Sequence, residues 1–332
     1  MDPNSGRSSD ALTAGFSWAF GTLGVLFGIL VLWTLVYCYA IYKQEIRAFR
    51  KTTFARICLL VFIWVFGSLL AVIKCLPLII CRGCFHPRVG EKAFHYASKL
   101  GKTIARWVIA PPIVLGKENL PEDSSKPVIF VANHQSMLDI CLLYYIDRRF
   151  RWVSKSAVFT IPGVGLLMIL NQDVPLKRGK KESILKMFAG CRESVQDDGV
   201  SLMIFPQGTR QRFEILPFKD GAFELACDLN VPVVPITISI PADIWTNPKN
   251  PVSLTIHPMI NPASGLVQVR EEAYKAIMSC LPYYSEELEE KGRTSYLKAK
   301  QERKKMKDRG RTSFSCSCNL HLFDRNKDEP LI

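Results

Sequence analysis

The chain is poor in histidine, with five in 332 residues, and no two of them stand at a spacing that suits a metal site. It lacks the G-x-S-x-G stretch, so a hydrolase that uses this serine nucleophile is not indicated. No internal repeat of fixed period occurs, which argues against a repeat architecture. The eleven cysteines show no regular spacing, so we expect no disulfide framework and predict a reducing compartment.

Charge is unevenly distributed along the chain. Residues 11–42 contain no charged side chain, whereas the whole chain carries 43 Lys and Arg against 30 Asp and Glu, a formal net charge of +13. An excess of this size suggests an anionic partner, either nucleic acid or an anionic membrane surface. Hydrophobic residues make up 48% of the chain and are concentrated before residue 82, so the membrane is favoured and no nucleic acid partner is expected.

The N-terminal part predicts membrane attachment. After a tail at residues 1–15, residues 16–42 are long and apolar enough to cross the roughly 30 Å hydrocarbon layer as a retained transmembrane helix. A basic linker follows at residues 43–56. Residues 57–81 form a second apolar segment, which either spans the membrane or dips into one leaflet and returns.

Residues 82–110 mix apolar and basic side chains at loosely helical spacing, which suits an amphipathic helix lying on anionic headgroups. An ordinary surface helix of the following domain is the alternative. This segment is about as basic as residues 43–56, so the positive-inside rule does not decide the orientation of the chain.

A change of pattern marks a separate domain, residues 111–285, in which short apolar runs alternate with helical stretches. Such alternation predicts an α/β domain with a mixed, mostly parallel sheet covered by helices. Strands are expected at 128–132, 153–154, 174–177, 200–205, 233–240 and 252–256, and helices at 136–145, 181–196, 221–228 and 270–278. Residues 286–332 form a charged C-terminal helix or tail, whose basic part would be attracted to anionic lipid.

The stretch VANHQSMLDI, residues 131–140, places an imidazole and a carboxylate directly after an apolar run. On a continuous helix, His134 and Asp139 would lie roughly 140° apart and would not meet. If a strand ends near Ala132 and a helix begins at Ser136, the carboxylate in the first helical turn reaches back to the imidazole. Ser136 followed by Asp139 is also a capping-box pattern, and this alternative explains Asp139 without any chemistry.

Two further strand ends carry basic residues. IFPQGTRQ, residues 204–211, ends an apolar run in a turn that Pro206 and Gly208 enforce, and Arg210 projects from it, which is a common way to hold a phosphate. VPLKRGKKES, from Val174, places a cluster of Lys and Arg after another strand. Because ligands of open α/β sheets bind outside the carboxyl ends of the strands, these features together predict a general base beside an anion site.

Four sequence blocks, and their order along the chain, resemble those of the glycerolipid acyltransferase family, which includes the 1-acylglycerol-3-phosphate acyltransferases. NHQSMLD matches the NHxxxxD signature of the family, and FPQGTR is similar to its FPEGTR block. VPLKR resembles the block that ends in a phosphate-binding Arg, and VPVVPITI resembles the last apolar block. LPFKDGAF also fits, and order and spacing agree over about residues 112–262.

The resemblance implies a glycerol-3-phosphate acyltransferase-like fold and a defined reaction. A fatty acyl group would move from acyl-CoA, as co-substrate, to the free hydroxyl of lysophosphatidic acid, with no other cofactor and no metal. His134 would take the proton of that hydroxyl, and Asp139 would hold the imidazole tautomer and stabilise the imidazolium. The residues implied to bind the substrate phosphate are Arg178, Arg210 and Lys219, and those implied to position the substrate are Asn133, Gln207, Gly208 and Thr209.

Gln207 departs from the pattern of the family, which has Glu at this position. An amide donates and accepts hydrogen bonds but carries no charge, so we expect a polar residue that positions the glycerol part of the substrate. The departure is the one feature that favours a non-catalytic membrane protein that binds lipid. Another lysophospholipid, or glycerol 3-phosphate, is the alternative acceptor.

The resemblance also implies a location. Acyl-CoA is cytosolic, and the acceptor lipid and the acyl chain reside in the bilayer. The expected protein is therefore an integral membrane protein of the endoplasmic reticulum, with its catalytic domain on the cytosolic face and membrane lipid as a partner.

Overall fold

The computed structural model describes residues 51–177, 181–210 and 215–281, together with isolated positions between residues 28 and 39 and between residues 290 and 301. The transmembrane helix predicted at 16–42 and the charged tail predicted at 286–332 lie almost entirely outside the described residues. The chain divides into two units, Met1–Phe62 and Ile63–Ile332.

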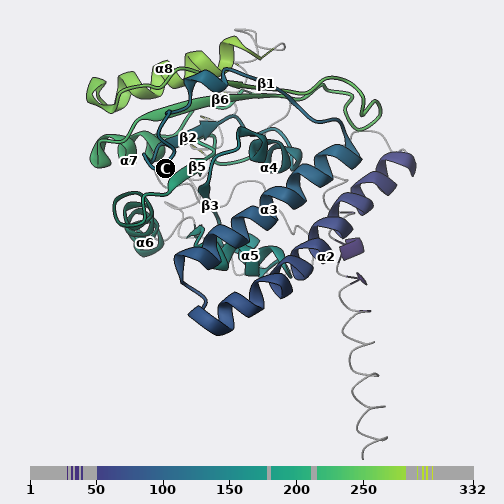
Figure 1. The fold of residues 1–332 in the computed structure, drawn as a ribbon. Helices are drawn as coiled ribbons and strands as arrows, with labels where there is room; N and C mark the ends of the chain where they lie inside the picture. The colour runs from purple at the N-terminus through teal and green to yellow at the C-terminus, as the bar shows by residue number, and fades with distance from the viewer. Residues whose placement is uncertain are drawn as a thin grey trace, which may run out of the picture. The chain divides into compact units, whose positions relative to one another are not determined.

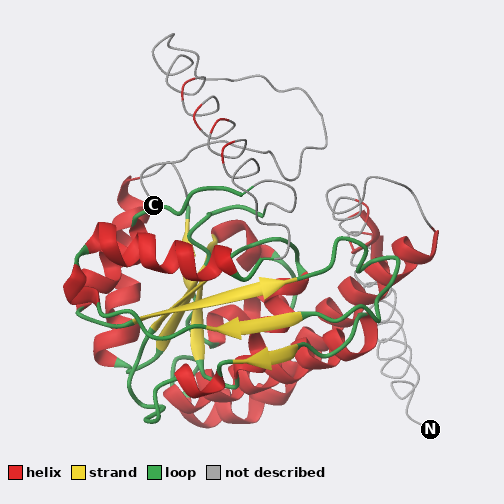
Figure 2. Cartoon of the chain, turned by 90° about the horizontal axis from the view of Figure 1, so that it is seen from above, coloured by secondary structure: helices red, strands yellow, loops and turns green. Residues whose placement is uncertain are grey.

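A seven-stranded sheet lies at the centre of the second unit (Figures 1 and 2). The strand order is β1-β7-β6-β2-β5-β3-β4, and every neighbouring pair is parallel except β6 and β7. The bounds are β1 (Ile113–Leu115), β2 (Ile129–Ala132), β3 (Phe150–Lys155), β4 (Val174–Leu176), β5 (Ser201–Ile204), β6 (Val233–Ser239) and β7 (Ser253–Ile256). The predicted mixed, mostly parallel sheet is confirmed, although β1, with three largely exposed residues, was not predicted.

Helices cover both faces of this sheet (Figure 2). The bounds are α3 (Pro87–Val108), α4 (Leu138–Leu143), α5 (Val164–Leu170), α6 (Lys181–Arg192, continued by a π-helical turn at Glu193–Asp197), α7 (Gly221–Leu229) and α8 (Leu266–Ser279). The short helix α5 was not predicted, because seven apolar residues after a Pro-Gly pair show no period that separates helix from strand.

Strand β2 shows how the two faces are filled. Ile129 and Val131 belong to the core that the sheet shares with α6, α7 and α8. Phe130 lies between them, and its ring packs edge-to-face on Phe150, which in turn contacts Phe94 of α3. Successive side chains of a strand point to opposite faces, so a strand covered on both sides reads as an unbroken apolar run.

Helix α2 (Lys51–Arg82) begins inside the predicted basic linker and runs through the whole second apolar segment. In the second unit, Ala71 and Cys75 of α2 pack with residues of α3 and α5. Other side chains of the same helix are exposed, and these are Leu70, Ile73, Leu76 and Ile80. Among the described residues, Phe54–Arg82 is the one helix long and apolar enough to cross a membrane, a test that core helices and signal sequences also pass.

Helix α3 occupies most of the predicted interfacial segment, residues 82–110. Its buried residues, Val89, Ala93, Ile104, Ala105 and Val108 among them, form the face that packs on the domain. The exposed residues include Lys92, Lys99 and Arg106. Because its apolar face is already covered by the protein, the structure favours the alternative of a surface helix that belongs to the domain.

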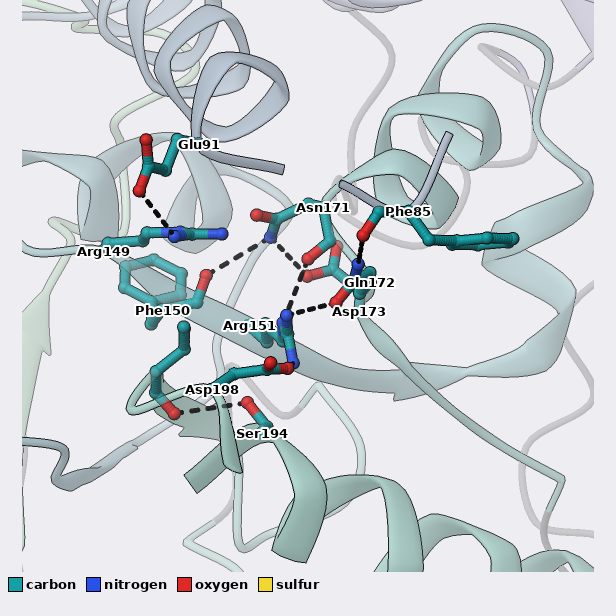
Figure 3. A network of polar contacts seen from close by, with 11 residues as sticks. Phe85, Glu91, Arg149, Phe150, Arg151, Asn171, Gln172, Asp173, Ser194 and Asp198 are labelled. Atoms are coloured by element: carbon teal, nitrogen blue, oxygen red, sulfur yellow. Dashed lines mark hydrogen bonds and ion pairs between the residues drawn. The ribbon is translucent and has the colours of Figure 1, made fainter. Parts of the chain in front are cut away.

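A buried polar network ties β3 to the chain around β4 (Figure 3). Arg151, only 4% exposed, donates hydrogen bonds to the Asp198 carboxylate (2.6 Å) and to the Asn171 carbonyl (3.1 Å). The side-chain oxygen of Gln172 accepts another hydrogen bond from Arg151, and its amide nitrogen donates to the Phe85 carbonyl (2.9 Å). The guanidinium therefore holds three separate segments together.

Asp173 is a second buried group of this network. Its Oδ1 accepts hydrogen bonds from the Trp152 backbone N–H (2.9 Å) and from the Asn171 side-chain amide (2.7 Å). Burial disfavours the charged carboxylate and raises the pKa of Asp173 from 3.8 to about 7.

Replacing Asp173 with Asn is expected to change how stability depends on pH. In the parent, folded Asp173 keeps its proton up to about pH 7, whereas the unfolded chain releases it near 3.8. Between these values the folded state binds more protons, so the free energy of unfolding falls as pH rises. From about pH 5 to about pH 7 this group should account for roughly 2 kcal/mol, since one pKa unit corresponds to about 1.4 kcal/mol.

Asp173→Asn keeps an oxygen that can accept both hydrogen bonds but does not titrate, so its stability should lack this decrease. Chemical unfolding followed by tryptophan fluorescence at several pH values measures the effect. A variant with the same pH dependence as the parent would show that Asp173 does not carry it.

Candidate active site

The site lies where the neighbouring parallel strands β2 and β5 end. Val131 and Ile204 are in register, so the residues that follow the two strands emerge at the same edge of the sheet. His134 lies in the turn between β2 and α4, and Gln207 lies in the turn after β5. As the sequence predicted, the chain therefore breaks between strand and helix at His134.

The imidazole and the carboxylate meet across this break. Nδ1 of His134 lies 2.7 Å from Oδ2 of Asp139. The same oxygen accepts hydrogen bonds from the backbone N–H groups of Gln135 (2.7 Å) and Ser136 (2.9 Å). The capping pattern and the His–Asp contact, which the sequence left as alternatives, are thus both present and share one oxygen atom.

The environment of this pair suits proton transfer. The side chain of Asp139 is fully buried, whereas that of His134 is 15% exposed. An ionised carboxylate only accepts hydrogen bonds, so Nδ1 of His134 carries a proton and Nε2 is the nitrogen that exchanges a proton with a substrate. Oδ1 of Asp139 is buried and has no hydrogen-bond partner in the described part of the chain. The arrangement can act as a general base with a fixed tautomer.

The other described histidines lack this arrangement. Nδ1 of His86 accepts the backbone N–H of Arg88 (3.2 Å) at the start of α3, and His95 is exposed on the same helix. Nε2 of His257 lies 2.8 Å from the hydroxyl of Thr237, and burial lowers the pKa of His257. Among the described histidines, His134 alone is paired with a carboxylate.

Cys141 is a buried thiol on the same short helix as Asp139. Burial, helped by the charge of Asp139, raises the pKa of Cys141 to about 12. A thiol in this state holds almost no thiolate at neutral pH, so it is unsuited to nucleophilic catalysis. Within the described residues, no three side chains of His, Cys, Asp or Glu lie together as a metal site would require.

Asn133 holds the turn rather than facing a substrate. It is 1% exposed, its side-chain nitrogen donates to the Ile238 carbonyl (2.9 Å), and its oxygen accepts the Ile238 N–H (2.8 Å). Both polar groups of the amide are therefore engaged with the backbone of β6. This favours a role in fixing the end of β2 over the substrate contact that the sequence suggested.

The turn after β5 has the tight geometry predicted from Pro206 and Gly208. Gly208 adopts φ +72°, which favours glycine, and its N–H donates to the Phe205 carbonyl (2.9 Å). The Lys219 N–H donates to the Pro206 carbonyl (3.0 Å). A Cβ atom added to Gly208 would lie 2.8 Å from Nζ of Lys219, so this ammonium group lies directly against the turn.

The remaining residues of the predicted phosphate site are placed in part. Thr209 and Arg210 follow Gly208 in the same turn and are partly buried. Arg210 and Lys219 are therefore two cationic residues of one loop region. Arg178 lies outside the described residues. The residue before it, Lys177, donates its backbone N–H to the Ser183 hydroxyl (2.9 Å), which ties that loop to the start of α6.

Phe205 is a neighbour of the base that the sequence did not point to. Its ring stacks on the His134 imidazole with 3.9 Å between centroids and 12° between planes. Phe205 is the residue that follows β5, and an aromatic residue at the end of an apolar run gives no signal of such a contact. Pairing of β2 with β5 places it there.

Comparisons with known proteins point to one family. Residues 112–239 match the family model described as Acyltransferase. Over these residues the chain is similar to the acyltransferase family, and the resemblance carried by the four sequence blocks is confirmed.

Three curated relatives share a more specific name. A 1-acyl-sn-glycerol-3-phosphate acyltransferase of Chlamydomonas reinhardtii is 34% identical over 57% of this chain and 59% of its own length. The enzyme of that name from Saccharomyces cerevisiae is 37% identical over 38% of this chain and 42% of its own. The human 1-acyl-sn-glycerol-3-phosphate acyltransferase beta is 31% identical over 38% and 46%. The alignments span about half the length of these relatives.

A solved structure supports the fold. The chain matches the crystal structure of PlsC, the 1-acyl-sn-glycerophosphate (LPA) acyltransferase of Thermotoga maritima, with a TM-score of 0.53 and 23% identity. The match covers 78% of this chain and 98% of that one. Identity at this level shows a shared fold, in line with the fold class predicted from the sequence.

Proposed function

We propose that this chain transfers a fatty acyl group from acyl-CoA to the free hydroxyl of lysophosphatidic acid and so forms phosphatidic acid. The observation that carries the proposal is the contact between His134 and Asp139 at the carboxyl end of β2, beside the turn that bears Arg210. The names of the curated relatives support the choice of acceptor.

The proposed reaction needs one base and no covalent enzyme intermediate. Nε2 of His134 takes the proton of the acceptor hydroxyl while the hydroxyl oxygen attacks the thioester carbonyl carbon. Asp139 stabilises the imidazolium that forms. When the tetrahedral intermediate collapses, the C–S bond breaks, the imidazolium returns its proton to the departing sulfur, and CoA leaves as a thiol.

Arg210 and Lys219 would bind the phosphate of the acceptor, with Arg178 as a further candidate. Because the phosphate is bound, the acceptor hydroxyl is held near His134. The reaction then takes place between oriented groups and does not depend on a chance encounter in solution.

The membrane forms part of the proposal. The acceptor lipid and the acyl chain reside in the bilayer, and helix α2 is apolar enough to be a span. We place the protein in the membrane of the endoplasmic reticulum, with the catalytic domain facing the cytosol, where acyl-CoA is available. Residues 57–81 lie in one continuous helix, which suits a crossing and not a hairpin that returns to the same side. Accessibility labelling of Cys58 and Cys81 from each side tests this: a crossing places the two thiols on opposite sides.

A donor-by-acceptor screen tests the function. The full-length protein in detergent or proteoliposomes is given labelled acyl-CoA with lysophosphatidic acid, other lysophospholipids or glycerol 3-phosphate. We expect phosphatidic acid as the main product. Product with another acceptor would move the proposal to that acceptor. Binding of lysophosphatidic acid without product from any donor would favour the non-catalytic lipid-binding protein.

Replacing Arg210 with Gln is expected to weaken binding of the acceptor, since the guanidinium would lose a charge-assisted contact with the phosphate. One such contact contributes roughly 1.5–3 kcal/mol, so KM for lysophosphatidic acid should rise by about tenfold or more. KM for acyl-CoA should change little. As a control, Arg192→Gln removes an exposed Arg at the end of α6 and should leave both KM values unchanged. Equal rises in both KM values would contradict the assignment.

A further inference from the structure

The turn after β5 contacts His134 at two places. The Phe205 ring stacks on the imidazole, with 3.9 Å between the two centroids. Two residues further on, Oε1 of Gln207 accepts the backbone N–H of His134 (2.7 Å). One turn therefore holds both the side chain and the main chain of this residue.

The orientation of the Gln207 amide follows from its partner. A backbone N–H only donates, so the atom that faces it is the carbonyl oxygen of the amide. Gln207 is 4% exposed, and the hydrogen bond is partly buried. A Glu side chain would also offer an oxygen here, whereas an apolar side chain would leave the His134 N–H without this acceptor. The contact therefore explains why an amide serves at a position where the family has a carboxylate.

Stacking restrains a movement that the other contacts allow. The hydrogen bond to Asp139 fixes Nδ1, but the imidazole can still tilt about that bond. A parallel ring at van der Waals distance opposes the tilt. Phe205 is itself backed by Trp152 (5.9 Å between centroids, 21° between planes), whose indole N–H donates to the Tyr144 hydroxyl (3.2 Å). The imidazole thus stacks on Phe205, which in turn stacks on the buried Trp152.

The turn itself is firmly held. The Gly208 N–H bonds to the Phe205 carbonyl, and the Lys219 N–H bonds to the Pro206 carbonyl. These bonds close the turn on both sides of Gln207, so the backbone that carries the Phe205 and Gln207 side chains is held in place.

We propose that Phe205 and Gln207 are positioning residues that hold His134 at the angle needed for proton transfer. The inference rests on the proposed function, because it takes His134 as the base. It assigns two residues of the FPQGTR segment to the enzyme's own histidine rather than to the substrate. Reacting groups must be held closely, and a displacement of about 1 Å costs roughly 10²-fold in rate.

Paired variants of the full-length protein test the proposal. Phe205→Leu removes the ring and Phe205→Tyr keeps it; Gln207→Met removes the acceptor oxygen and Gln207→Glu keeps one. We expect Phe205→Leu and Gln207→Met to lower kcat by between about tenfold and 10²-fold, with both KM values within about twofold of the parent. Phe205→Tyr and Gln207→Glu should keep most of the parental kcat.

Phe223→Leu serves as the matched control. Phe223 is a fully buried phenyl on α7 that stacks on Phe218 and is not among the rings that contact His134. Its replacement should lower the melting temperature and leave kcat of the folded protein near that of the parent. A rise in KM in place of a fall in kcat, or an equal loss of kcat in Phe223→Leu, would overturn the proposal.

A measurement without turnover separates this proposal from the proposed function. In protein labelled with ¹³C at the histidine rings, His134 is assigned by the signal that His134→Ala lacks. The ring current of the stacked Phe205 should move the chemical shift of this signal upfield in the parent and in Phe205→Tyr. This upfield shift should be absent in Phe205→Leu. An unchanged signal in Phe205→Leu would refute the stacking. If the parent were inactive on every acceptor but Phe205→Leu still lost the upfield shift, the proposed function would be refuted and the stacking contact would stand.

Discussion

Replacing His134 with Ala is expected to lower kcat by about 10²- to 10⁴-fold, the usual contribution of a general base. The variant keeps the binding residues of the turn after β5, so KM for lysophosphatidic acid and for acyl-CoA should change much less than kcat. The physical reason is that Nε2 takes the proton of the hydroxyl during attack, and the methyl group of Ala does not replace it. Initial rates of product formation at saturating substrate measure the loss.

His95→Ala is the matched control for this variant. It also removes one imidazole, but from the exposed side of α3, where the ring contacts Tyr96. Its kcat should equal that of the parent. Because His134 also packs on Phe205, the melting temperature of His134→Ala must be measured, so that loss of folded protein is not mistaken for loss of the base. A folded His134→Ala protein with parental kcat would rule out His134 as the base.

Replacing Asp139 with Asn should lower kcat by roughly 10²- to 10⁴-fold, with the fold retained. Oδ2 of Asp139 accepts hydrogen bonds from the His134 ring and from the backbone N–H groups of Gln135 and Ser136. Three donors meet at this atom, so the oxygen of Asn must take its place and the NH₂ group must point away. The contacts are kept, and the negative charge that stabilises the imidazolium is lost.

This variant carries a structural cost that can be measured separately. The NH₂ group of Asn would occupy the position of Oδ1, which is buried and lacks a hydrogen-bond partner among the described residues. A buried donor left unpaired costs about 1–3 kcal/mol, so a lower melting temperature is expected together with the lower kcat.

Asp147→Asn is the control for loss of an acidic group. Asp147 pairs with Lys102 and Lys117 on the surface and has φ 56°, a conformation that Asn accepts readily. This variant should keep the parental kcat. If Asp139→Asn also kept it, Asp139 would serve as a helix cap without a part in catalysis.

The presence of Gln207 where the family has Glu is compatible with an active enzyme. The sequence departure from Glu to Gln favoured a protein without catalysis. In the structure, the residue gives a carbonyl oxygen to the backbone of His134, and either residue type can provide that atom. The amide nitrogen of Gln207 is the group through which it could still contact a substrate.

Some features could not be read from the sequence, for physical reasons that are specific to each element. The amphipathic pattern of residues 82–110 indicates an apolar face but not what covers it; the buried face of α3 packs on the domain, and contact of the helix with lipid headgroups stays a prediction. Strand β1 has three residues, too few to show a period of two. The buried network around Arg151 and Asp173 joins residues 20 to 47 positions apart and has no local pattern. The expected segments at 16–42 and 286–332 remain predictions.

The contact between His134 and Asp139 was open to sequence reasoning because they are five positions apart, and the geometry of one strand-to-helix break decides whether they meet. The order of the four blocks was likewise sufficient to show the resemblance to acyltransferases, and the alternating apolar runs were sufficient to predict a mostly parallel sheet. The contacts of His134 with Phe205 and Gln207 span 71 and 73 positions and depend on the parallel pairing of β2 with β5. Short-range backbone geometry depends on neighbouring residues and can therefore be predicted from them. The contacts of Phe205 and Gln207 with His134 form only once two strands that are distant in the sequence lie side by side.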